Sequence, residues 1–243
     1  MLKEALQYVV NLGKESQEII TKEINGEIYT KGEASRLPID EASTMYFNTL
    51  SAVVDYVKTS VADERIKTPY IVSVDHNEVN VHSGLDERLN RTFLAHVQPL
   101  LPNIKFNNYM DMESFVIQLK TCFIETENLN RLVSIVSSIT DEAKVSFEDD
   151  GVGMKISQVS GTTIKSKENL QINPIVRLAP YRTFTEVAQP ESRFLFRVRD
   201  GGKLALYEAD GGMWKLEAQQ NVSTYLREAL KDEINGGYVM VMG

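Results

Sequence analysis

Two Asp-Gly-Gly triplets near the C-terminal end of the chain constrain its fold more than any other feature. They are Asp200-Gly201-Gly202 and Asp210-Gly211-Gly212, ten residues apart. Glycine readily adopts the positive φ that tight hairpin turns require, so each triplet predicts a turn. The stretches before, between and after the triplets read as β-strands, and the first alternates clearly in character. We therefore expect three antiparallel strands over residues 193–199, 203–209 and 213–219.

The residues that follow predict a helix laid over this meander. Between residues 222 and 230 the apolar side chains recur at the spacing of one helical face, and Asn221 stands where an N-cap would lie. The only tryptophan, Trp214, falls on the last expected strand. We expect it to anchor the core beneath the helix.

The remaining elements come in runs of strands and not in strand–helix alternation. This order favours an α+β fold with a largely antiparallel sheet, a C-terminal three-strand meander and covering amphipathic helices. We expect an N-terminal helical or arm region over residues 1–68 and an α+β core domain over residues 69–243. The expected elements are one or two helical turns within 3–22, a loop or short hairpin over 25–36, helices over 43–61 and 112–123 (the second capped by Asp111), a hairpin over 70–82, and strands over 91–97, 132–139, 143–147, 152–159 and 170–178.

Composition limits the partners and the compartment. The chain of 243 residues carries 34 acidic and 26 basic side chains, a net charge of −8, which disfavours non-specific binding to nucleic acid or to an anionic membrane. A local basic patch is still compatible with this balance. The single Cys122 cannot form an intramolecular disulfide. No secretory signal and no apolar run of about eighteen residues is present, so we expect a cytoplasmic protein with no membrane partner.

Several sequence blocks stand out between about residue 110 and the C-terminus. They are Asn173-Pro174-Ile175-Val176, Pro180-Tyr181-Arg182-Thr183-Phe184, Glu186-Val187, Gln189-Pro190-Glu191-Ser192 and residues 208–218, joined by Asp149-Asp150-Gly151 and residues 110–115. Taken together, these blocks resemble the YfdQ-like family of phage and prophage proteins, whereas the first hundred residues match weakly. The family has no known function. The resemblance therefore implies a viral or prophage gene acting in a bacterial host, and it brings no active site with it.

Arginines are concentrated around the first strand of the meander. Arg193, Arg197 and Arg199 share one face of that strand, and Arg177 and Arg182 lie upstream. The guanidinium group donates to phosphate in a fixed geometry, so the cluster could form an anion site. The alternative is pairing with acidic residues on adjacent strands, for which Glu191, Glu208 and Glu217 are the candidates.

Two aromatic residues flank one of these arginines. Tyr181 and Phe184 lie beside Arg182 in a segment that follows a proline. Such a composition is typical of a base-stacking or protein-contact site, and equally of the start of a strand. The complete set of candidate ligand-binding residues is Arg177, Tyr181, Arg182, Phe184, Arg193, Arg197 and Arg199.

No motif in the chain indicates catalysis or a cofactor. The histidines His76, His82 and His96 fit no zinc-binding spacing. Asp149-Asp150-Gly151 reads as a plain turn, because it lacks the further oxygen ligands of a calcium loop. We expect Cys122 to be buried and inert, because it belongs to the apolar stripe of its helix. We therefore expect no catalytic residue, no bound metal and no cofactor.

These observations favour a non-enzymatic, self-associating binding protein of a phage or prophage. Its expected partners are copies of itself and an anionic nucleotide-like small molecule or a host protein. Capture of a host nucleotide signal would counter antiviral defence. Two alternatives stay open: a metal-dependent phosphoester hydrolase using Asp149, Asp150 and the histidines, and a nucleic-acid accessory protein in recombination, which the acidic charge makes unlikely.

Overall fold

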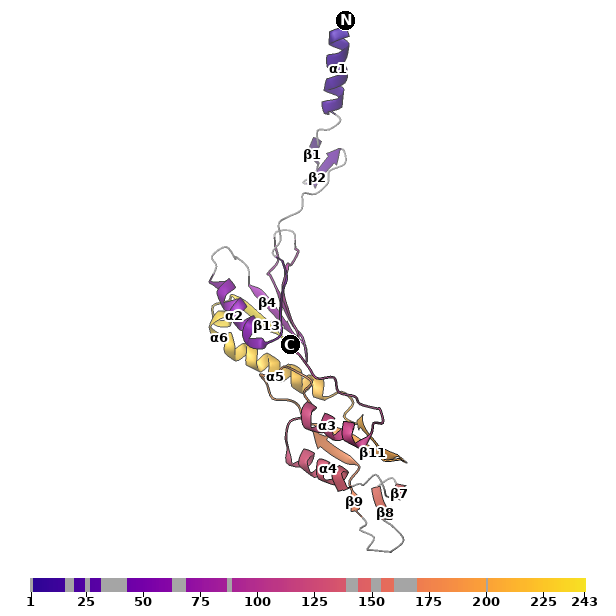
Figure 1. The fold of residues 1–243 in the computed structure, drawn as a ribbon. Coiled ribbons are helices and arrows are strands. Elements are labelled where there is room, and N and C mark those ends of the chain that lie inside the picture. The colour runs from indigo at the N-terminus through magenta and orange to yellow at the C-terminus, as the bar shows by residue number, and fades with distance from the viewer. Residues whose placement is uncertain are drawn as a thin grey trace. The chain divides into compact units, whose positions relative to one another are not determined.

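The computed structural model divides the chain into two compact units, Met1–Glu41 and Ala42–Gly243. It describes residues 2–15, 20–24, 27–31, 43–62, 69–86, 89–138, 144–149, 154–159, 170–199 and 201–243 (Figure 1). The smaller unit holds helix α1 (Leu2–Glu15) and an antiparallel hairpin of β1 (Ile20–Ile24) and β2 (Glu27–Lys31). Helix α1 is longer than the one or two turns that we expected. Residues 42–62 belong to the larger unit, whereas we had placed them in an N-terminal region ending at residue 68.

The larger unit contains a five-stranded sheet in the order β13-β4-β5-β6-β3. Strands β4, β5 and β6 are antiparallel neighbours, as the predicted hairpin over 70–82 requires. The two edge strands instead run parallel to their neighbours, so this sheet is mixed. The sequence did not predict either edge strand. The bounds are β3 Met45–Phe47, β4 Tyr70–Val74, β5 Val79–His82, β6 Phe93–Val97 and β13 Val239–Met242.

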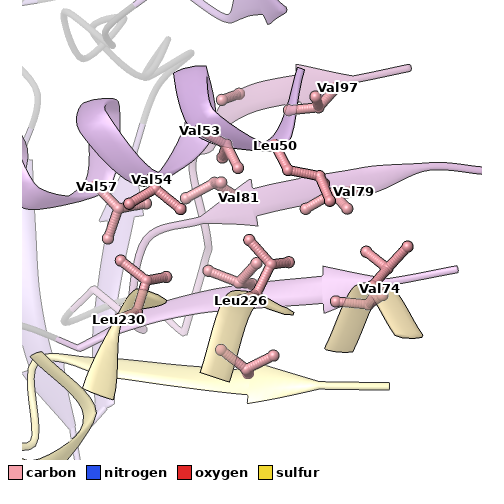
Figure 2. Close-up of a cluster of buried hydrophobic side chains, with 14 of the residues drawn as sticks. Leu50, Val53, Val54, Val57, Val74, Val79, Val81, Val97, Leu226 and Leu230 are labelled. Atoms are coloured by element: carbon pink, nitrogen blue, oxygen red, sulfur yellow. The ribbon is translucent and has the colours of Figure 1, made fainter. Parts of the chain in front are cut away.

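Helices α2 (Leu50–Val61) and α5 (Trp214–Ala229) pack on one face of this sheet, with the short α6 (Lys231–Asn235) following. Burial alternates along β4 and β5, so that every second side chain points towards the helices. Figure 2 shows the aliphatic side chains of the helices meeting those of the strands. The resulting first core includes Leu50, Val53, Val57, Val72, Val74, Val79, Val81, Val222, Leu226 and Leu230.

The second sheet is an antiparallel meander of β10 (Ile175–Leu178), β11 (Ser192–Arg199) and β12 (Lys203–Glu208). Helices α3 (Met112–Cys122) and α4 (Glu127–Ser138) pack with its apolar face in a second core. Phe194 and Phe196 point into that core and are fully buried. The α+β class and an antiparallel three-stranded sheet with covering helices are therefore confirmed. The helix predicted to cover the meander is instead part of α5, which packs on the five-stranded sheet. Asn221 lies inside this helix and does not cap it, and Trp214 is half-buried at its start and is not a core residue. Asp111 caps α3 as expected, because its carboxylate accepts the Ser114 N–H at 2.8 Å.

Two predicted strands are in fact helical. The segment 213–219 begins α5, because the second Asp-Gly-Gly turn leads into a helix, with the Met213 N–H bonded to the Asp210 carbonyl. The third strand of the meander is β10 instead. The segment 132–139 lies largely in α4, where Leu129, Leu132 and Val136 are buried at helical spacing. Its β-branched residues suggested a strand, but packing in the second core determines its structure.

Other boundaries differ less from the prediction. Residues 43–49 do not begin the helix but include β3, and Thr49 caps α2 by accepting the Ala52 N–H. The run 170–178 is split between β9 (Leu170–Ile172) and β10. Strand β9 completes a third, antiparallel sheet with β7 (Lys144–Asp149) and β8 (Met154–Val159). None of the described helices is both long enough and apolar enough to cross a membrane.

The segment between β10 and β11 joins the two cores. Phe184 from this segment is fully buried in the first core. Glu186 accepts the Leu50 N–H at 2.7 Å and the Ser51 N–H at 2.8 Å, which satisfies donors at the start of α2. The Gln189 side chain holds the segment closed, since it accepts the Arg182 N–H and donates to the Phe184 carbonyl.

Replacing Glu186 should test this connection. Glu186→Ala removes the acceptor of two N–H groups at the start of α2, so the free energy of unfolding should fall by about 1 kcal/mol. Urea denaturation followed by circular dichroism measures the change. Glu228→Ala, at an exposed position of α5, is the matched control and should change stability by less than about 0.5 kcal/mol. Equal losses in the two variants would contradict a capping role for Glu186.

Candidate functional site

Arg182 lies at the centre of the candidate site, in the segment that joins the two cores. Only 7% of its surface is exposed. Its Nη1 donates to Glu208 Oε1 at 2.7 Å, and its Nη2 donates to the Ser192 hydroxyl. Its Nε is buried and has no hydrogen-bond partner among the described residues. The guanidinium group is therefore held in place but not fully satisfied.

Aromatic rings surround the same guanidinium group. Its Cζ lies 3.9 Å from the centre of the Trp214 ring, a distance typical of a cation–π contact. Phe194 and Phe106 lie farther away, at 5.5 and 5.9 Å. Burial lowers the pKa of Arg182 to about 10, although the charges of Glu208 and Asp210 oppose the shift. Arg182 is therefore still a cation at neutral pH.

Asp210, from the second Asp-Gly-Gly turn, is a second carboxylate that interacts with the charge of Arg182. Burial by itself raises the pKa of Asp210. Hydrogen bonds from the Gly212 N–H, the Ser192 hydroxyl and the Trp214 N–H, together with the charge of Arg182, outweigh this effect and lower the pKa. Two carboxylates thus lie close to one buried guanidinium group. This part of the site is not strongly positive.

A cavity of about 550 Å³ opens beside this group; we call it the Arg182 cleft. Its walls come from the turn between β4 and β5, from the segment after β6, from the joining segment and from the start of α5. The volume lies within the range of small-molecule sites, about 300–1,000 Å³. The lining combines flat rings, amides and cations, and includes His76, Asn77, Asn103, Tyr181, Trp214 and Lys215.

His76 and Trp214 connect the two sides of the cleft. Their rings meet edge to face with centres 5.2 Å apart, and the His76 carbonyl accepts the Thr183 hydroxyl. His76 Nδ1 lies 2.8 Å from Asp75 Oδ1. Hydrogen bonds from the His76 side chain and N–H lower the pKa of Asp75. The β4–β5 turn, the joining segment and α5 are therefore linked around the cavity.

The seven predicted site residues lie in three different places. Tyr181 and Arg182 line the Arg182 cleft. Phe184 is a core residue and is not accessible to a ligand. The four arginines Arg177, Arg193, Arg197 and Arg199 lie on the face of the meander that points away from the second core. The structure does not bring them to the cleft.

The predicted alternative of salt bridges is confirmed for two arginines. Arg182 pairs with Glu208, and Arg177 lies 3.7 Å from Glu191 with both side chains exposed. Sequence reasoning missed Trp214 as a site residue, because its stacking partner is distant along the chain. It also missed His76 and Lys215. The only local signal was that Trp214 and Lys215 closely follow a glycine turn.

His82 and His96 are engaged in ring packing and hydrogen bonding. His96 Nδ1 lies 2.7 Å from Asn80 Oδ1, and the His82 ring stacks on Phe93 at 5.1 Å. Within the described residues no group of three or more His, Cys, Asp or Glu side chains is placed to hold a metal ion. Asp150 lies outside the described residues. Cys122 is buried, as expected.

Comparison with known proteins gives no match: no protein-family model, no curated sequence and no solved structure is similar to this chain.

The Arg182–Glu208 and Arg177–Glu191 salt bridges should differ in how much their removal lowers the free energy of unfolding. Glu208→Ala leaves the buried charge of Arg182 without its nearest partner and should lower the free energy of unfolding by about 2–3 kcal/mol. Glu191→Ala removes the partner of an exposed arginine and should cost less than about 1 kcal/mol. Urea denaturation of both variants measures the difference. A loss for Glu208→Ala no larger than that for Glu191→Ala would show that Arg182 does not depend on this pair.

Proposed function

We propose that this chain is a phage or prophage accessory protein that binds a small anionic, nucleotide-like molecule without catalysis and associates with copies of itself. By withdrawing a host nucleotide signal from solution, such a protein would counter the antiviral defence of the host. The proposed viral origin rests on the resemblance of the region from about residue 110 to residue 243 to the YfdQ-like family. The ligand class rests on one observation, the composition of the Arg182 cleft.

The cleft offers a separate group for each part of a nucleotide. The Trp214 and Tyr181 rings are flat surfaces of the kind on which bases stack. The side-chain amides of Asn77 and Asn103 both donate and accept hydrogen bonds, as the edge of a base requires. The cation for the phosphate is Lys215, which is exposed at the start of α5. Arg182 contributes less to phosphate binding, because Glu208 already neutralises it.

Self-association is supported by the face of the five-stranded sheet opposite α2 and α5. On β13, Val239 and Val241 are buried, whereas Met240 and Met242 are 51% and 46% exposed. Tyr46, on the other edge strand, is 74% exposed and lies against His96. These exposed apolar and aromatic side chains lie at the two edges of the face, and exposed apolar side chains of this kind are typical of protein contacts. Symmetric homo-oligomers are a common outcome for such a surface.

Titration of the single tryptophan tests the ligand. At least one of AMP, ATP and a cyclic dinucleotide should change the emission of Trp214. Lys215→Ala should weaken that ligand about tenfold, because a hydrogen bond to a charged group contributes about 1.5–3 kcal/mol. The control is Lys231→Ala, an exposed lysine on α6, which should leave the affinity unchanged. Absence of any response, or equal effects of the two variants, would contradict the proposed cleft site.

Native mass spectrometry on protein purified from bacterial host cells tests both parts of the proposal at once. The expected spectrum is a discrete oligomer carrying an extra mass, which Lys215→Ala loses and Lys231→Ala keeps. A monomer would contradict self-association. An oligomer without an extra mass would contradict tight retention of a ligand but leave the titration as the test of weaker binding.

A further inference from the structure

The outward face of the β10–β11–β12 meander carries five cations, with a row of Ile175, Leu195 and Tyr207 between its two cross-strand pairs. Antiparallel register places Arg177 opposite Arg193 and Lys203 opposite Arg199, with Arg197 between them along β11. Arg177, Arg193, Arg199 and Lys203 are exposed, and Arg197 is half-buried. We call these five residues the cationic face. The opposite side of the same strands is apolar and packs with the second core.

This arrangement places like charges directly across from each other. Arg177 and Arg193 form one such cross-strand pair, and Arg199 and Lys203 form another. Like charges opposite each other destabilise a sheet. The carboxylate of Glu191 lies 3.7 Å from Arg177 in an exposed geometry, which contributes little. An anion lying along the face would reduce the repulsion in both pairs.

Tyrosine rings lie at the edge of the same face. The Cζ of Arg199 is 4.2 Å from the centre of the Tyr109 ring, and Tyr109 meets Tyr207 edge to face at 6.2 Å. Tyr207 is opposite Leu195 in the register of β11 and β12, so it shares the outward face. Cations interspersed with half-buried aromatic rings are the composition of surfaces that bind single-stranded nucleic acid through its phosphates and bases.

The length and charge of the face fit an extended strand of nucleic acid. Its two cross-strand pairs of cations are separated by a row of Ile175, Leu195 and Tyr207. From Arg193 to Arg199 the strand extends about 20 Å, enough to follow several nucleotides of an extended strand. The net charge of −8 argued against nucleic acid, but it is a sum over the whole chain. Charges farther apart than about 10 Å are screened at 0.1 M salt, so the local group decides.

We propose that the cationic face binds single-stranded nucleic acid along its phosphate backbone. The arginines contact phosphates, and Tyr109 and Tyr207 provide rings for the bases. This site is separate from the Arg182 cleft and does not depend on the ligand proposed there.

Fluorescence anisotropy with a labelled mixed-sequence DNA strand of about 20 nucleotides tests the proposal over a series of salt concentrations. Affinity should fall linearly on logarithmic axes as salt rises, because phosphate contacts release counterions. Arg197→Ala combined with Arg199→Ala should weaken binding and make the slope shallower by about 1.4, since each contact to a single strand contributes about 0.7. Replacing both arginines by lysine should keep most of the slope.

The controls separate this site from the rest of the molecule. Arg131→Ala removes an exposed arginine from α4, which packs on the apolar side of the meander, and should leave both affinity and slope unchanged. Urea denaturation of the double variant shows whether it is folded. No binding at low salt, an equal slope in the double variant and in Arg131→Ala, or capture of poly-glutamate in preference to DNA would each overturn the proposal.

Discussion

The contact between Arg182, Glu208 and Trp214 is the interaction on which the arrangement of the larger unit depends. A buried guanidinium group is stable only where its charge and its donors are matched, and removing one partner costs several kcal/mol. Its partners come from the end of β12, from the start of β11 and from the start of α5. The segment that carries Arg182 also inserts Phe184 into the first core. We infer that this one contact fixes how the joining segment and α5 meet, and so creates the cleft beside them.

The elements that could be predicted from the sequence are those whose signal is local. Alternation of Phe194 and Phe196 with arginines identified β11 and its two faces, and Asp111 identified the start of α3. The prediction from sequence was wrong where one local pattern is compatible with two different structures. A glycine turn can lead into a strand or a helix, and the Asp210 turn leads into α5, with the Asp210 carboxylate accepting the Gly212 N–H and its carbonyl accepting the Met213 N–H just before the helix. The parallel edge strands could not be predicted, because β13 pairs with a strand far away in the sequence.

The candidate site was predictable in composition but not in assembly. The sequence identified Tyr181 and Arg182 as an unusual pair, and they do line the cleft. It also grouped Arg182 with the arginines of β10 and β11, because all five occur within a short stretch. The fold separates them, since Arg182 belongs to a segment that turns back between the cores whereas the others alternate outward on a sheet. Trp214, His76 and Lys215 join the site only through tertiary contacts, which no local pattern reports.

The cleft and the cationic face differ in a way that solution conditions can separate. In the cleft, Arg182 is neutralised by Glu208 and shielded from water, so binding there depends on stacking, amide contacts and one exposed lysine. Buried or partly buried charges are screened little by salt. On the cationic face the charges are mostly exposed, and contacts to phosphates would release counterions with a steep dependence on salt. Ionic strength therefore acts on the two surfaces to different degrees, and a ligand whose affinity resists salt belongs to the cleft.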